Sequence, residues 1–229
     1  MKSNSIKIQF FKIIVWACAL ANAGCTQNLE QKLPTYGRQN VNQKEINGNT
    51  VIDTVYHKIP EFRFLNQDSS FISQDFFDHK IYIANFFFTS CPSICPVMQR
   101  NLLIAYEKYK DDKRVAFLSH SIDYRNDHPG RLKEYAKRLG VDNDQWQFVT
   151  GKKNEVFNIS KEYLVFTEED ENAPGGYDHQ GLLILIDQER RIRGVYDGTV
   201  DEQVQKLLSD IKILLKEYNK EVNLSTVSG

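Results

Sequence analysis

The chain has 229 residues, of which 41% are hydrophobic and 26% are charged, and its formal net charge is −1. These proportions are typical of a globular domain and exclude a disordered chain of low hydrophobicity and high net charge. They also argue against nucleic-acid binding, which needs a clustered basic surface.

The first 25 residues predict an export signal. Three lysines precede the apolar residues 13–21, a segment that is too short to span a bilayer comfortably. Residues 23–25 resemble the end of a bacterial lipobox, which makes Cys25 the lipidation candidate and Cys18 a weaker one. Ordinary signal cleavage and an uncleaved membrane anchor are the alternatives. We therefore predict an extracytoplasmic (periplasmic-side) protein, tethered to the membrane by a lipid or by its N-terminal segment, in an oxidising environment.

The next residues predict a tether followed by one domain. Residues 26–57 are rich in Gln, Asn, Lys and Gly without an apolar period, which predicts a flexible tether. The domain is expected over residues 58–218, followed by a tail at 219–229. Inside the domain, the alternation at 61–65 and a second short apolar segment at 71–72 predict an N-terminal β-hairpin.

Two cysteines follow the next predicted strand. The apolar residues 81–88 predict a buried strand, and a helical pattern at 96–110 begins with a proline, which is favourable at a first helical position. Cys91 and Cys95 therefore stand at a strand-to-helix turn, where the helix dipole favours negative charge. Such a position lowers the pKa of a thiol, and the thiolate is the form that attacks disulfides or binds metals.

The spacing of these cysteines favours metal binding over a disulfide. Residues four apart on a helix have Cβ atoms about 5–6 Å apart, whereas an unstrained disulfide needs about 3.5–4.5 Å. Two thiolates, each about 2.3 Å from one ion, tolerate the wider separation. Pro92 and Pro96 interrupt regular helix geometry, so a disulfide across the turn stays open, as do a structural bridge and two buried thiols.

The remaining sequence alternates strands and helices. Strands are predicted at 114–122, 147–150, 181–187 and 192–196, helices at 129–139, 154–163 and 201–217, and an exposed acidic loop at 168–176. This order predicts an α/β fold, a thioredoxin-like sandwich with a central mixed β-sheet flanked by helices. In such sheets sites gather beyond the carboxyl ends of strands, where we expect Cys91, His120 and Asp123. His120 is a candidate accessory ligand.

A third donor is predicted at His179. It follows the glycine pair at 175–176, which permits a mobile loop, and precedes the buried strand at 181–187. An imidazole would complete a set of two cysteines and one histidine, and these donors suit copper or zinc more than magnesium or calcium. The alternative is a histidine with a purely structural role.

Three stretches, residues 91–96, residues 121–129, and residues 178–179 with 183–187, resemble the Sco/SenC family, and the similarity covers about residues 55–217. This resemblance implies a membrane-tethered, thioredoxin-fold copper protein that helps assemble the binuclear copper site of cytochrome c oxidase.

Carried over residue by residue, the resemblance implies that Cys91, Cys95 and His179 bind copper as Cu(I) or Cu(II). Asp123 and Asp127 match a family motif, and Asp123 is a candidate to support the ligands from outside the coordination sphere. Asp178 precedes the histidine and is a candidate to orient it.

Two functions follow from these residues. The first is a metallochaperone that delivers copper to the copper-accepting subunit of cytochrome c oxidase. The second is an enzyme, a thiol–disulfide oxidoreductase that acts on cysteines of that subunit or of other exported proteins and needs a thiol–disulfide reductant. In that case Cys91 attacks and Cys95 resolves. Disulfide exchange does not require His179, so this residue separates the two. Peroxide reduction is a weaker third function, because no typical peroxidase motif is evident.

Overall fold

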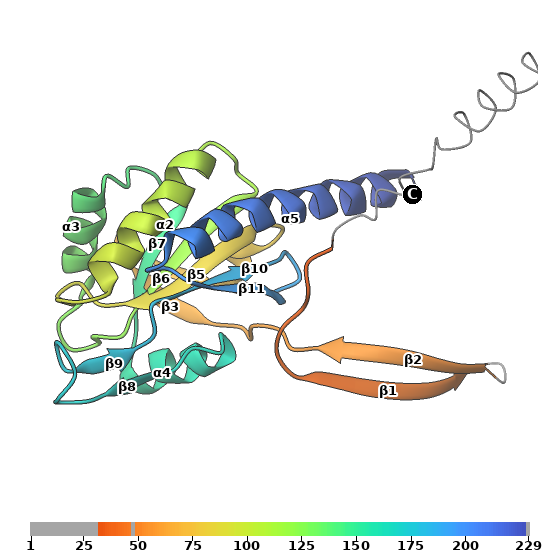
Figure 1. The fold of residues 1–229 in the computed structure, drawn as a ribbon, viewed down its shortest axis with the longest axis horizontal. Helices are drawn as coiled ribbons and strands as arrows, with labels where there is room; N and C mark the ends of the chain where they lie inside the picture. Colours follow the sequence, from red (N-terminus) through yellow and green to blue (C-terminus); the bar gives the residue numbers. More distant parts are fainter. Residues whose placement is uncertain (1–31, 47–48, 228–229) are drawn as a thin grey trace, which may run out of the picture. The chain divides into compact units, whose positions relative to one another are not determined.

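A computed structural model describes residues 32–46 and 49–227 (Figure 1). Its main feature is a seven-stranded sheet with the strand order β11-β10-β5-β6-β7-β3-β4, accompanied by two two-stranded sheets. The predicted export signal, with Cys18 and Cys25, and the first residues of the predicted tether lie outside the described residues. Within the described ranges, no helix combines the length and the apolarity needed to cross a membrane.

Three parallel strands form the centre of the sheet. They are β5 (Ile81–Phe87), β6 (Val115–Ser121) and β7 (Trp146–Thr150), and every residue in them is buried. Their nearly continuous apolar sequence is typical of strands that are covered on both faces.

Antiparallel strands extend this centre on both sides. On one side β10 (Leu182–Ile186) pairs with β5 and with β11 (Ile192–Asp197). On the other side the predicted hairpin, β3 (Arg63–Asn66) and β4 (Phe71–Ser73), pairs with β7. The sheet is therefore mixed, and the predicted thioredoxin-like α/β class with an N-terminal hairpin is confirmed.

Helices cover both faces of the sheet (Figure 1). Their bounds are α2 (Cys95–Tyr109), α3 (Pro129–Leu139), α4 (Lys153–Glu162) and α5 (Asp201–Val227), with a 3₁₀ turn η1 at Gln74–Phe77. Tyr135 of α3 packs on Phe87, whereas Tyr163 at the end of α4 packs on the next residue back, Phe86. Successive residues of a strand point to opposite faces, so α3 and α4 lie on opposite faces.

Three predicted boundaries differ from the structure. The segment predicted to be irregular contains an antiparallel hairpin, β1 (Gln39–Ile46) and β2 (Asn49–Tyr56), so that prediction was wrong there. Polar and apolar residues are both exposed along these two strands, so their sequence lacks the alternation of hydrophobic and polar residues that predicts a half-buried strand. Helix α5 runs to Val227, through most of the predicted tail. The predicted loop at 168–176 is flanked by two short paired strands, β8 (Thr167–Glu169) and β9 (Tyr177–His179).

A buried guanidinium fixes the start of the described chain. Arg193 of β11 donates to the carbonyl oxygens of Leu33 and Pro34 at 2.8 and 3.0 Å. It also forms ion pairs with Asp187 at 3.0 Å and with Glu217 of α5 at 2.9 Å. The burial of this charge is thus compensated by carboxylates and carbonyls, and residues 33–34 are fastened to the sheet and to α5.

Candidate metal centre

The two cysteines stand at the turn between β5 and α2, as predicted. Cys91 lies four residues after the end of β5, and its N–H donates to the Phe88 carbonyl at 3.2 Å. Cys95 is the first residue of α2, and Pro96 occupies the first helical turn, where its missing N–H costs no intrahelical bond. Both thiols are buried and free, at 7% and 1% exposure. We call residues 88–95 the cysteine loop.

The histidine comes from a different element. His179 ends β9, where it pairs with Thr167 of β8, and it is 7% exposed. We call residues 167–179 the histidine hairpin. Its turn contains Gly175 and Gly176 at φ of 81° and 85°, in the left-handed region that favours glycine. A Cβ on Gly175 would lie 2.7 Å from the Phe88 ring, so this turn can approach the cysteine loop only with glycine at that position.

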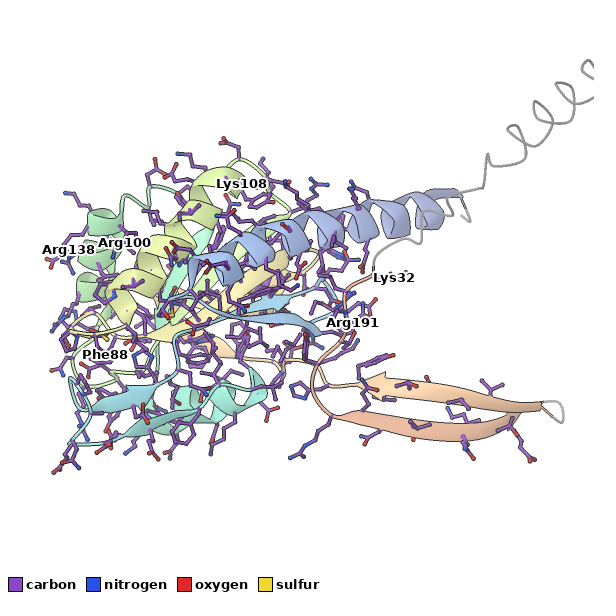
Figure 2. All side chains as sticks on the ribbon, viewed as in Figure 1. Lys32, Phe88, Arg100, Lys108, Arg138 and Arg191 are labelled. Atoms are coloured by element: carbon purple, nitrogen blue, oxygen red, sulfur yellow. The ribbon has the colours of Figure 1, made fainter. Side chains whose placement is uncertain are left out.

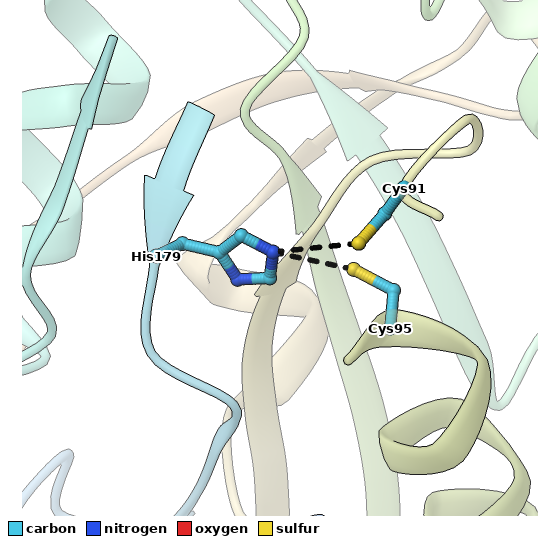
Figure 3. Close-up of side chains that lie close together, drawn as sticks. All are labelled: Cys91, Cys95 and His179. Atoms are coloured by element: carbon cyan, nitrogen blue, oxygen red, sulfur yellow. Dashed lines mark hydrogen bonds between the residues drawn. The ribbon is translucent and has the colours of Figure 1, made fainter. Parts of the chain in front are cut away.

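The fold brings the three donors to one point (Figure 3). The His179 Nε2 atom lies 3.4 Å from the Cys95 Sγ atom and 3.8 Å from the Cys91 Sγ atom. All three ligand atoms lie within 4.8 Å of one another, and no second cluster of this kind occurs among the described residues. Bond lengths of about 2.3 Å to sulfur and about 2.0 Å to nitrogen separate the ligands of a trigonal site by about 4 Å. One ion can therefore contact all three.

The thiols differ in acidity because they are hydrogen-bonded to each other. The bond from the Cys95 thiol lowers the pKa of Cys91 well below its ordinary value, and His179 adds to this effect. The same bond and burial raise the pKa of Cys95 above its ordinary value. Free of metal, the pair therefore favours one thiolate and one thiol, and metal binding at both sulfurs would release the second proton.

Phe88 separates the strand core from the site. This side chain, labelled in Figure 2, lies with its ring centroid 5.6 Å from that of His179, edge to face, and 5.2 Å from that of Tyr177. The aromatic wall limits access of water to the imidazole from this side. Low local polarity strengthens electrostatic interactions between a bound ion and its ligands.

The three aspartates that the sequence associates with the site, Asp123, Asp127 and Asp178, make different contacts in the structure. His179 Nδ1 has no hydrogen-bond partner and Asp178 is exposed, so this carboxylate does not hold the ring in the structure. Asp123 instead accepts a hydrogen bond from the Tyr177 hydroxyl, two residues before the histidine. Asp127, which the sequence indicated only by its place in a motif, is buried and bonded to Thr89 in the cysteine loop.

His120 does not belong to the site. Its ring stacks on Phe86 and is enclosed by Phe62, Phe64 and Tyr163, with both ring nitrogens unpartnered. Burial lowers the pKa of His120 to about 3. The prediction of an accessory ligand was wrong, because this side chain points to the sheet face that α4 covers.

Known proteins share this chain's sequence and fold. Residues 52–216 match the family described as SCO1/SenC. The SCO1 protein homolog of Bacillus subtilis is 28% identical over 171 residues, which cover 72% of this chain and 86% of that protein.

Two solved structures are similar as well. A SCO1/SenC family lipoprotein from Bacillus anthracis is 28% identical with a TM-score of 0.64, covering 69% of this chain and 95% of that one. Arabidopsis thaliana ScoI, solved with copper bound, is 23% identical with a TM-score of 0.57, covering 67% and 97%. At that identity the second likeness supports the fold alone.

Proposed function

This chain belongs to the SCO1/SenC family, and on that premise we propose that it is a copper-binding metallochaperone. Cys91, Cys95 and His179 would bind the copper, which is cargo rather than a resident cofactor. The observation that carries the proposal is the convergence of these three donors, from two separate elements, within 4.8 Å of one another.

The number of donors argues against a structural zinc site, and membership in the SCO1/SenC family favours copper over a catalytic zinc site. Thiolate sulfur and imidazole nitrogen suit both metals, but structural zinc sites almost always have four protein ligands. The cluster in the described part of the chain offers three. A three-coordinate site suits Cu(I) and leaves one side of the ion open to a ligand of an acceptor protein.

We propose the copper-accepting subunit of cytochrome c oxidase as the acceptor, because the family resemblance implies assembly of its binuclear copper site. Transfer would then occur on the extracytoplasmic side of the membrane. The Bacillus anthracis relative is a lipoprotein, which supports a lipid on Cys25. Loss of membrane association in a Cys25→Ser variant of the full chain, measured by fractionation, would test this anchor.

Copper binding is tested by titrating the reduced protein with Cu(I) against a chromophoric chelator. Replacing His179 with Ala should weaken binding at least about tenfold, because one of three ligands is lost. The exposed His79 is a matched control. It lies at a positive φ of 59° that asparagine tolerates, so His79→Asn should bind like wild type. Equal affinities in wild type and His179→Ala would remove the histidine from the site.

Thiol–disulfide exchange is the second candidate, and the lowered pKa of the Cys91 thiol beside Cys95 favours it. Cys91, whose pKa is lowered, would attack a substrate disulfide, and Cys95 would displace the reduced substrate by closing a Cys91–Cys95 disulfide. The protein loses two electrons and the substrate gains them, so an external dithiol reductant must regenerate the pair.

Reduction of a disulfide-bonded peptide separates the two functions. The His179→Ala variant should keep this activity and lose tight copper binding if the two are independent. A Cys95→Ser variant should lose both.

A further inference from the structure

The residues between β6 and α3 contact both halves of the candidate metal centre. We infer that Asp123 and Asp127 are positioning residues, which hold the cysteine loop and the histidine hairpin at the separation that copper needs. We call residues 121–127 the linking segment. The inference rests on the proposed copper binding and explains how the apo protein keeps three distant donors together.

Asp127 holds the cysteine loop. Its carboxylate accepts from the Thr89 N–H at 2.9 Å and from the Thr89 hydroxyl at 2.5 Å. Arg131 lies 3.5 Å from the same carboxylate and donates to the Thr89 hydroxyl at 2.7 Å. Asp127 is 1% exposed, so its carboxylate accepts these charge-assisted bonds from a buried position, although Arg131 itself is partly exposed. They fix Thr89, which is two residues before Cys91.

Asp123 holds the histidine hairpin. Its carboxylate, also buried, accepts from the Tyr177 hydroxyl at 3.1 Å. Tyr177 and His179 are two apart on β9, so their side chains lie on the same face of the strand. Fixing the tyrosine therefore fixes the direction in which the imidazole points.

Neighbouring residues add a second attachment to the hairpin. The Tyr124 hydroxyl donates to the Glu169 carboxylate at 2.9 Å, and Arg125 forms an ion pair with it at 3.0 Å. Glu169 pairs with Tyr177 across β8 and β9. The linking segment thus contacts both strands of the hairpin.

Ser121 joins the two carboxylates. Its hydroxyl donates to Asp127 at 2.6 Å and accepts from the Asp123 N–H at 3.2 Å. The Asp127 N–H in turn donates to the Asp123 carbonyl at 2.9 Å. The two attachments therefore share one short, internally bonded segment at the end of a central strand.

Two single-hydroxyl variants test this arrangement by Cu(I) competition titration of the reduced protein. Tyr177→Phe removes only the bond to Asp123 and keeps the ring against Phe88. Thr89→Val keeps the side-chain shape and removes the hydroxyl that Asp127 and Arg131 bind. Each should raise the Kd for Cu(I) about tenfold, the lower range for a residue that supports a metal ligand.

A matched control removes the same kind of bond elsewhere. The Tyr196 hydroxyl of β11 donates to the buried carboxylate of Asp210 in α5 at 2.7 Å. Tyr196→Phe should leave the Kd for Cu(I) within about twofold of wild type, although it also loses a buried tyrosine–aspartate hydrogen bond.

The His179→Ala background distinguishes positioning from a general loss of stability. With no imidazole to aim, Tyr177→Phe should have no further effect on the Kd, whereas Thr89→Val should still raise it through the cysteines. The inference is overturned if Tyr177→Phe binds Cu(I) like wild type, or if it weakens binding equally with and without His179. The His179→Ala titration alone reports on the proposed copper site, so the two ideas can fail separately.

Discussion

The cysteine loop and the histidine hairpin supply the same site from very different parts of the fold. The loop joins β5 and α2, which belong to the seven-stranded sheet and its covering helices, and both thiols lie in the main core. The hairpin is a separate two-stranded sheet, in which β8 and β9 pair only with each other among the described strands.

This difference assigns different roles to the ligands. Opening the cysteine loop would disturb the core, so the two sulfurs form a fixed platform. The hairpin can separate at a lower free-energy cost, because its strands pair only with each other and side-chain contacts such as those of Tyr177 and Glu169 hold it to the rest of the domain. If the site carries copper as proposed, departure of the imidazole would begin its release, and we expect mutations on the two sides to have different consequences.

The largest effect on stability should come from Asp127→Ala, which removes the carboxylate that holds the cysteine loop. Removing the buried carboxylate leaves the Ser121 hydroxyl and the Thr89 N–H without their acceptor, and the partly exposed Arg131 loses its ion pair. We expect the free energy of unfolding to fall by about 4 kcal/mol, measured by urea denaturation.

Asp178→Ala is the comparison on the hairpin, since its carboxylate is exposed. It should change the free energy of unfolding by no more than about 0.5 kcal/mol. Equal losses in the two variants would mean that the buried bonds of Asp127 contribute no more to stability than an exposed carboxylate does.

A second effect is a pH dependence of stability that arises from His120, in the core of the seven-stranded sheet. Burial lowers the pKa of His120 to about 3, whereas an unfolded histidine titrates near 6.5. The unfolded state therefore binds the proton first as the pH falls, and stability is lost from about pH 6.5 downward. At pH 5 the loss should be about 2 kcal/mol relative to pH 7.

The variant His120→Phe should remove this part of the pH dependence, since phenylalanine fits an aromatic cluster and does not titrate. Urea denaturation at pH 7 and pH 5 gives the comparison. The exposed His79 provides the control, and His79→Asn should retain the wild-type difference. A wild-type protein whose stability is the same at both pH values would contradict the buried, neutral histidine.

The smallest effect is the difference in stability between alanine substitutions at the two glycines of the histidine hairpin. Both have positive φ, so alanine should cost about 1 kcal/mol at either position. Only Gly175 would also drive a Cβ into Phe88, whereas a Cβ on Gly176 meets nothing within 4 Å. Gly175→Ala should therefore be worse by about 1 kcal/mol, measured by urea denaturation. Equal costs would show that the turn does not need its close approach to the cysteine loop.

Local sequence signals predicted most of the sheet and the position of the cysteines. The apolar residues 81–88 contain all of β5, and Pro96 marks the first turn of α2. Asn47-Gly48, a strong hairpin signal, stands between β1 and β2, but the largely polar flanking residues do not show the alternation of a half-buried strand.

Contacts between distant residues could not be predicted in the same way. The bond between Thr89 and Asp127 joins residues 38 apart, and the one between Tyr177 and Asp123 spans 54. Neither has a periodic signature. His120 shows the effect of alternation along a strand. Its neighbour Ser121 donates to Asp127, which holds the cysteine loop, so His120 points to the opposite face of the sheet.

The contacts of Arg193 with Leu33 and Pro34 limit how far the domain can extend from a bilayer. If a lipid is attached to Cys25 as proposed, the first fastened residue, Leu33, comes only eight residues later. A fully extended chain covers at most about 3.5 Å per residue, so this leash is no longer than about 28 Å. The end of the domain at Leu33 would then stay close to the headgroups, while the metal centre, beside Phe88 at the opposite end of the domain from Lys32 (Figure 2), would meet acceptors farther from the membrane surface.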